Sequence, residues 1–169
     1  MKLNRYRALV ILSFTVFGIS IVSCEKPSVF EDEDLIYSLY QEAEDTLALD
    51  GSHYFLETYL YRNLMPGGPI PGERPLVSLL YLINTDSLEI SDELKIDKLY
   101  VINGSLVFKS IPEYNEDHSV ANYKQSLICR KGPEWDTGIR VDVIISIIQQ
   151  STKEVSYLIA RDQIIDKVE

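Results

Sequence analysis

The sequence predicts a mainly β fold, in which about seven antiparallel strands form a sandwich and a short N-terminal helix precedes them. Three observations predict this fold class. Short runs rich in β-branched and aromatic residues recur along the chain, turn-forming residues separate them at short intervals, and no long helical pattern lies between them. A small β-barrel and a mixed α+β domain are the alternatives that the same pattern allows.

The N-terminal segment, which precedes these elements, has the pattern of a secretory signal. Basic residues come first, and an uncharged apolar run over residues 8–22 follows, shorter than the about 20 residues of a membrane-spanning helix. The run leads into Ile21-Val22-Ser23-Cys24, in which an apolar residue and a small residue precede a cysteine. This pattern resembles the lipobox of bacterial lipoproteins. The resemblance implies that residues 1–23 are a cleaved signal peptide and that Cys24 is lipidated.

Lipidation of Cys24 implies a membrane anchor. Two or three acyl chains hold a protein more firmly than one, since each buried methylene contributes about 0.8 kcal/mol. Residue 25 is Glu rather than Asp, as in lipoproteins that are not retained at the inner membrane. We therefore expect an outer-membrane protein that faces the periplasm or lies on the cell surface. The acidic run at residues 31–34 resembles the surface-export tags of one group of Gram-negative bacteria.

The mature chain has the size of one domain, because 146 of the 169 residues remain after cleavage. We expect residues 24–34 to form an acidic tether and residues 35–169 to form a single β-sandwich domain. With 13 basic and 26 acidic residues, the mature chain has a formal net charge of −13, which excludes nucleic acid as a partner. If Cys24 is acylated, Cys129 has no cysteine partner, and we expect it to be a small buried side chain.

The folded part begins with a predicted helix and a predicted hairpin. Apolar residues recur every four positions from Leu35 to Leu47, which predicts a helix from about residue 34 to residue 44. Asp50-Gly51 then precedes residues 53–62, a run rich in aromatic and β-branched residues. This run is therefore predicted to be the second strand of a hairpin.

A second hairpin is predicted around Asn103-Gly104, which lies between the apolar runs 98–102 and 105–109. Asn-Gly tolerates the positive φ angles of a type I′ turn, so we expect that turn type here. Residues 120–129 and 155–161 are further predicted strands.

Two other predicted strands differ in the burial that their patterns indicate. Residues 76–83 are apolar on both alternating sides, which predicts a strand covered on both faces. In residues 139–147 the odd positions are apolar, which predicts a strand with one core face. The residues on its opposite side include Arg140, Asp142 and Ser146.

The number and spacing of these strands resemble those of immunoglobulin-like sandwiches. The resemblance covers the strand pattern only, because the cysteine pair and core tryptophan of antibody domains are absent. Residues 65–75, with four prolines and three glycines, and residues 111–119 are predicted loops.

No catalytic residue, metal ligand or cofactor site is predicted. His53 and His118 lie in different segments, and the sequence has no Gly-x-Ser-x-Gly, no Cys-x-x-Cys and no histidine pair at helical spacing. Gly67-Gly68 lacks the helix and lysine that a phosphate-binding loop requires. We therefore expect no enzymatic activity and no cofactor.

The candidate ligand contacts are aromatic. Tyr59 and Tyr61 lie on one side of a predicted strand, whereas Tyr114 and Trp135 lie in predicted loops. Aromatic rings stack on sugars and are enriched at protein interfaces. The alternative is structural, because tyrosine is common in strands and Trp135 could pack against one end of the fold.

Together these features predict a non-catalytic binding or assembly module of the cell envelope, which contacts an envelope protein or a glycan. A carrier of small apolar ligands in a barrel interior is the first alternative, and a hydrolase is the second. Asp45-Thr46-Leu47 and Asp86-Ser87-Leu88 resemble the short O-glycosylation motif of the same bacterial group.

Overall fold

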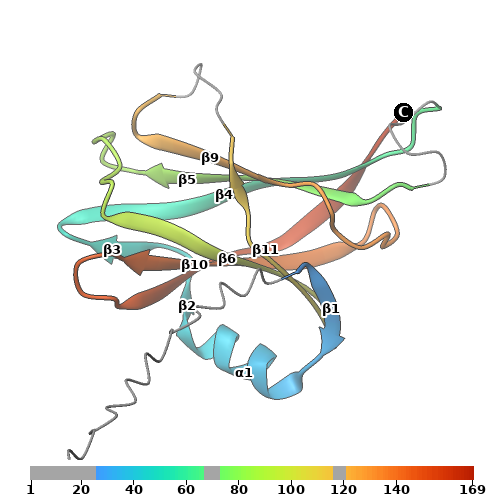
Figure 1. Ribbon diagram of the computed structural model, residues 1–169, viewed down its shortest axis with the longest axis horizontal. Helices are drawn as coiled ribbons and strands as arrows, with labels where there is room; N and C mark the ends of the chain where they lie inside the picture. The colour runs from blue at the N-terminus through green and yellow to red at the C-terminus, as the bar shows by residue number, and fades with distance from the viewer. Residues whose placement is uncertain (1–25, 67–72, 116–120) are drawn as a thin grey trace, which may run out of the picture.

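The computed structural model describes residues 26–66, 73–115 and 121–169 (Figure 1). The signal, Cys24 and His118 lie outside these residues. The predictions of a mainly β fold and of a short N-terminal helix are confirmed. The predicted immunoglobulin-like sandwich of about seven strands is not confirmed, because the described strands form one curled open sheet, a half-barrel. No helix in the described ranges is long and apolar enough to cross a membrane.

The long strand β11 (Val155–Val168) connects the two halves of this sheet. The strands are hydrogen-bonded in the order β1-β7-β6-β10-β11-β4-β5-β9-β8, and β2 and β3 pair with β11 and β4. The first part of β11 pairs antiparallel with β10, whereas residues 165–168 pair parallel with β4. We call the strands from β1 to the first part of β11 the helix half, and those from the end of β11 to β8 the open half.

Each predicted run contains a strand, but β11 continues to Val168, beyond the predicted end at residue 161, and β8 lies in the predicted loop at residues 111–119. The helix half contains β1 (Ser28–Glu31), β7 (Leu106–Ser110), β6 (Leu94–Asn103) and β10 (Arg140–Gln149). The open half contains β4 (Ser52–Asn63), β5 (Leu76–Asn84), β9 (Lys124–Cys129) and β8 (Glu113–Tyr114). The short side strands are β2 (Ala43–Glu44) and β3 (Leu47–Leu49).

The two halves face each other across a filled hydrophobic core. Alternate residues of each strand point inward, so Leu60 and Leu80 of the open half join Leu99 and Ile145 of the helix half in one buried cluster. Cys129 belongs to the same cluster, which confirms the expected small buried side chain.

The helix α1 (Glu33–Glu42) covers the other face of the helix half, as Figure 1 shows. Its Leu39 packs in a second buried cluster with residues of that face: Tyr100, Ile102, Val107, Ile144 and Ile159. The Asp32 carboxylate caps the helix by accepting a hydrogen bond from the Leu35 backbone N–H at 2.9 Å, and Glu33 and Asp34 lie in the first turn, where acids favour the helix dipole.

The assignment of residues 24–34 to an acidic tether is wrong for residues 28–34. Residues 28–34, which the sequence assigns to an acidic tether, form β1 and the start of α1. The pairing of β1 with β7 explains the strand, and the capping role of the acidic run explains the helix start.

Both predicted hairpins are present, but the turn after Asn103 differs in type from the prediction. Asn103 is paired with Leu106, so the turn consists of Gly104 and Ser105, and only Gly104 has positive φ, as at the first position of a type II′ turn. The expected type I′ turn at Asn103-Gly104 is therefore wrong. Asp50 and Gly51 both have positive φ, so the type I′ turn lies there.

The predictions of strand burial are wrong for two strands. The outward residues of β5 are only half-buried, although both sides of this strand are apolar. In β10, by contrast, Ile144 and Ser146 are buried on the side expected to be open, because α1 covers it. An apolar sheet face is thus left uncovered in the open half.

Candidate binding surface

The uncovered face is the outward side of β4, β5 and β9. Its residues are Phe55, Glu57, Tyr59, Tyr61, Val77, Leu79, Tyr81, Ile83, Lys124, Ser126 and Ile128. Eight of these eleven side chains are apolar or aromatic. The face lies on the opposite side of the molecule from α1 (Figure 1), and α1 is the only helix of the described ranges.

Strand register arranges these side chains in rows across the sheet. Tyr59 pairs with Leu79, and Leu79 pairs with Ile128, so three apolar side chains form one row, of which Tyr59 and Leu79 are accessible and Ile128, next to β8, is buried. Tyr59 is 43% exposed although it lies within a twelve-residue strand. An accessible group of apolar side chains of this kind indicates a contact site.

The two tyrosines predicted as ligand contacts lie together on this face. The rings of Tyr59 and Tyr61 stack, with centroids 5.4 Å apart and an interplanar angle of 27°. Mutual stacking occupies one face of each ring, so the pair presents a fixed aromatic ridge rather than two open platforms.

A charged pair crosses the face near its other end. The Lys124 ammonium lies 2.8 Å from a Glu57 carboxylate oxygen and 3.9 Å from the centroid of the Tyr81 ring. The ion pair and the cation–π contact hold Lys124 flat over the sheet. The charged pair therefore lies across the row of Glu57 and Tyr81, and the neighbouring row of Tyr59 and Leu79 is apolar.

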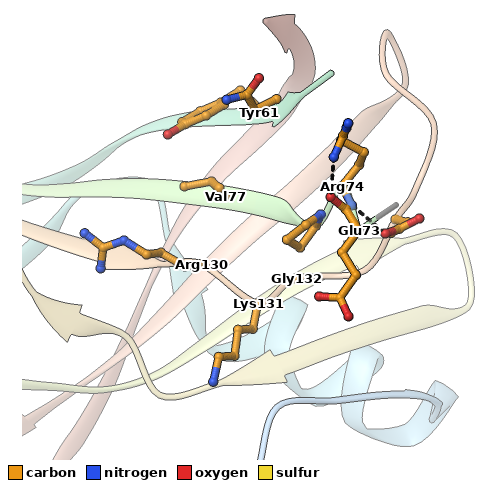
Figure 2. Close-up of a pocket in the computed structure, with 10 residues that line it drawn as sticks. Tyr61, Glu73, Arg74, Val77, Arg130, Lys131 and Gly132 are labelled. Carbon is orange, nitrogen blue, oxygen red and sulfur yellow. Dashed lines mark hydrogen bonds between the residues drawn. The ribbon is translucent and has the colours of Figure 1, made fainter. Parts of the chain in front are cut away.

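At the Tyr61 end, the face continues into a groove of about 620 Å³. Figure 2 shows Tyr61 and Val77 on neighbouring strands, with Arg130 and Lys131 beyond β9 and Arg74 before β5. The described lining residues are Tyr61, Asn63, Glu73, Arg74, Pro75, Val77, Arg130, Lys131, Gly132 and Glu134.

Arg62 holds the walls of the groove together. Its Nε donates to the Arg74 carbonyl at 2.7 Å, and its Nη1 donates to the Trp135 carbonyl at 2.8 Å. The Glu134 carboxylate lies 3.6 Å from the Arg62 Nη2 and accepts a hydrogen bond from the Arg74 backbone N–H at 2.7 Å. One half-buried guanidinium thus joins β4 to the segments before β5 and after β9.

The same region depends on a close backbone approach at Gly132. Its N–H donates to the Leu76 carbonyl at 3.0 Å. A Cβ on residue 132 would lie 2.8 Å from both the Leu76 Cβ and the Leu76 carbonyl oxygen. Only glycine lets the chain pass β5 at this distance.

The cations of the groove have few acidic partners. Lys131 has no ion pair with any residue that the structure describes, and Arg130 has only the exposed Glu113 at 3.6 Å. The Arg74 Nη1 donates to a backbone carbonyl, that of Glu73. Glu134 is already engaged by Arg62. In a chain with a formal net charge of −10, this is a local concentration of available positive charge.

The other two predicted contacts have structural positions. Trp135 is half-buried, packs against the core and supports the groove through its carbonyl. Tyr114 lies on β8 at the sheet edge, where burial raises the pKa of its hydroxyl and a backbone hydrogen bond with Ile96 of the helix half opposes that shift. Of the four aromatic candidates, Tyr59 and Tyr61 alone lie on the uncovered face.

The sequence did not single out several residues of this surface. Val77 and Leu79 were interpreted as core, and Arg74, Arg130 and Lys131 were not considered as contacts. Two signals point to them: a strand apolar on both sides, and adjacent basic residues in a strongly acidic chain.

No catalytic arrangement accompanies the groove in the described part of the chain. His53 lies away from it, where the His53 backbone N–H donates to Asp86 at 2.9 Å and its ring lies 3.3 Å from the same oxygen. The backbone bond first, and the ring second, lower the pKa of the Asp86 carboxyl. The described residues also contain no group of three or more His, Cys, Asp or Glu side chains that could hold a metal ion.

Comparisons with protein-family models, with curated proteins and with solved structures found no match. The surface is therefore interpreted from its own geometry and chemistry.

Proposed function

We propose that this chain is a non-catalytic binding module of the bacterial cell envelope, anchored in the outer membrane through Cys24, that docks a partner protein through the uncovered face. One observation carries the proposal: eight apolar or aromatic side chains lie on the outward side of three strands, and all of them except the buried Ile128 keep part of their surface exposed to solvent. Leaving such a surface in water is unfavourable, and a partner that covers it gains the free energy of its burial.

The chemistry of the face favours a protein over a glycan. Aromatic residues and arginine are enriched at protein interfaces, and both are present on this face and in the groove. Sugar binding needs open ring faces beside polar side chains, whereas Tyr59 and Tyr61 stack on each other and Leu79 and Ile128 are aliphatic. A glycan partner is retained as an outcome of the experiment below.

The groove adds a preference for negative charge in the partner. Arg74, Arg130 and Lys131 surround an apolar floor that includes Val77. An acidic side chain or a terminal carboxylate placed there would meet cations that lack strong internal partners. We therefore expect the partner to present an apolar surface next to an acidic group.

Site-specific photocrosslinking in intact cells tests the proposal. A p-benzoylphenylalanine residue replaces Leu79 on the uncovered face or, as the matched control, Val155, which is 49% exposed in the helix half. We expect a discrete protein adduct from position 79 only. Equal adducts from both positions, or none from position 79, would contradict the proposed docking face.

The binding of the identified partner then gives the energetic test. Leu79→Glu should weaken binding by at least about tenfold, or about 1.4 kcal/mol, because it places a charge in the apolar row that Leu79 forms with Tyr59. Val155→Glu should leave the affinity unchanged. Retained binding to protein-free envelope polysaccharide that Leu79→Glu abolishes would instead assign the face to a glycan.

The alternatives lack a supporting observation. A carrier of small apolar ligands needs space between the inward faces, where side chains of the two halves form one packed cluster. A hydrolase needs acids or a nucleophile that converge in the groove, where the described acids are Glu73 and Glu134 and Arg62 engages the latter.

A further inference from the structure

The short connection between Cys24 and the sheet limits how the domain can sit on a membrane. The first paired residue of β1 is Ser28, four residues after Cys24. Four extended residues span at most about 14 Å. Because β1 is hydrogen-bonded to β7 over its whole length, the connection cannot lengthen without the loss of sheet pairing.

The chain enters the fold on the α1 side. Strand β1 leads directly into α1, and Phe30 packs against the cluster beneath that helix. Figure 1 shows β1 and α1 together on one side of the molecule and β5 and β9 on the other. The point of entry therefore lies at the edge of the helix half, beside α1, and the three layers are stacked in the order α1, helix half and open half.

We propose that the lipid anchor holds the α1 side of the domain against the lipid headgroups and turns the uncovered face and the groove away from the membrane. This inference rests on one part of the proposed function, the acylation of Cys24. The packing distance between layers is about 10 Å, so the uncovered face lies about 20 Å farther from the membrane than α1 does.

The outward surface of α1 suits a position on the headgroups rather than within the acyl chains. Tyr37 is 69% exposed on that surface, and its amphipathic ring is of the type enriched at membrane interfaces. Glu33, Asp34 and Glu42 are also exposed on this helix, and their charges oppose deeper insertion. Contact is thus imposed by the anchor and not by an affinity of the helix for lipid.

Quenching by labelled lipids tests this orientation on the full acylated chain. A fluorescent coumarin amino acid replaces Tyr37 on α1 or Glu57 on the uncovered face, since both side chains are well exposed. The protein is reconstituted in phosphatidylcholine vesicles with or without a nitroxide on the headgroup. We expect several-fold stronger quenching at position 37 than at position 57. Equal quenching, or stronger quenching at position 57, would overturn the orientation.

A longer connection between Cys24 and β1 tests whether the short connection causes the proposed orientation. Twenty Gly/Ser residues inserted after Glu25 give a root-mean-square reach of about 25 Å, enough for the domain to turn. The quenching ratio between positions 37 and 57 should then fall toward one. An unchanged ratio would overturn the role of the short connection.

Mass spectrometry of Cys24 distinguishes a failure of the proposed acylation from a failure of the proposed orientation. A mature chain without acyl mass on Cys24, or one whose membrane association survives Cys24→Ser, contradicts the proposed anchoring. An acylated chain with equal quenching at the two positions contradicts the orientation alone.

Discussion

The centres of the two sheet halves, β10 and β5, carry similar apolar residues but have opposite surroundings. In β10, Ile144 points away from the core and is fully buried, because α1 packs over it. In β5, Leu79 points away from the core in the same way and is only half-buried. An apolar outward side chain is therefore buried in the helix half, whereas an equivalent apolar side chain is partly exposed to solvent in the open half.

The covered and the uncovered apolar side chains are therefore expected to have different roles, the former in folding stability and the latter in binding. An apolar side chain that another element covers contributes to folding, whereas one left in water contributes little and is a liability unless a partner covers it. The helix half has its covering layer within the chain. We infer that the open half obtains its layer from outside, which is the basis of the proposed docking face.

A matched pair of truncations should give the largest effect. Ile144→Ala is expected to lower the free energy of unfolding by about 2–5 kcal/mol, because it leaves a cavity between α1 and the sheet. Leu79→Ala should cost less than about 1 kcal/mol, because the open side gains no cavity. Urea unfolding followed by circular dichroism measures both. Equal losses would mean that the open half is covered after all.

The next effect concerns the groove. Arg62→Ala should lower the free energy of unfolding by about 2–3 kcal/mol, because the carbonyls of Arg74 and Trp135 lose a charged donor. Trp135 is the only tryptophan of the chain, so a red shift of the tryptophan fluorescence would show that the segment after β9 has moved and exposed this side chain to water.

Arg62→Lys is the control for charge in this experiment. An ammonium cannot reproduce the fork of donors, so this variant should resemble Arg62→Ala. Full stability and unshifted fluorescence in Arg62→Lys would show that charge alone, and not geometry, holds the groove.

How far the sequence predicts this molecule depends on the kind of information required. Hairpins, strands and the helix are local, and Asp50-Gly51, the four-residue apolar spacing from Leu35 and the alternating runs predict them. The coverage of a face is not local. Whether Leu79 or Ile144 is buried depends on where α1, more than 30 residues away in sequence from either residue, packs in three dimensions. The groove cations were missed for the same reason, since Arg74 and Arg130 meet only through the β4-β5-β9 pairing.

Alkaline unfolding should report on the helix half. The Tyr40 hydroxyl of α1 donates to Asp142 of β10 at 2.6 Å. Burial first, and Asp142 second, raise the pKa of Tyr40 above its ordinary value of 10.0. The unfolded chain ionises this group at a lower pH than the folded chain does, so stability is present below about pH 10 and is lost as pH rises further.

Tyr40→Phe isolates this contribution. The variant should lose about 1–2 kcal/mol near neutral pH, because Asp142 loses a donor. Its stability should also fall less steeply above pH 10 than that of the wild type. Urea unfolding from pH 7 to 11 measures both effects. Parallel curves for the two proteins would contradict the assignment.

Acid unfolding should report on the open half, with the smallest effect. The pKa of Asp86 is lowered by the His53 backbone N–H and then by the His53 ring, so the folded chain holds the charged carboxylate more strongly than the unfolded chain does. This contribution is present above the ordinary pKa of 3.8 and is lost as pH falls through the lower folded value. In a plot of the free energy of unfolding against pH, Asp86→Asn should reduce the decline on the acid side. It should leave the decline on the alkaline side, which is assigned to Tyr40, unchanged. A change on the alkaline side as well would contradict the assignment of that decline to Tyr40 and its Asp142 and Arg161 neighbours alone.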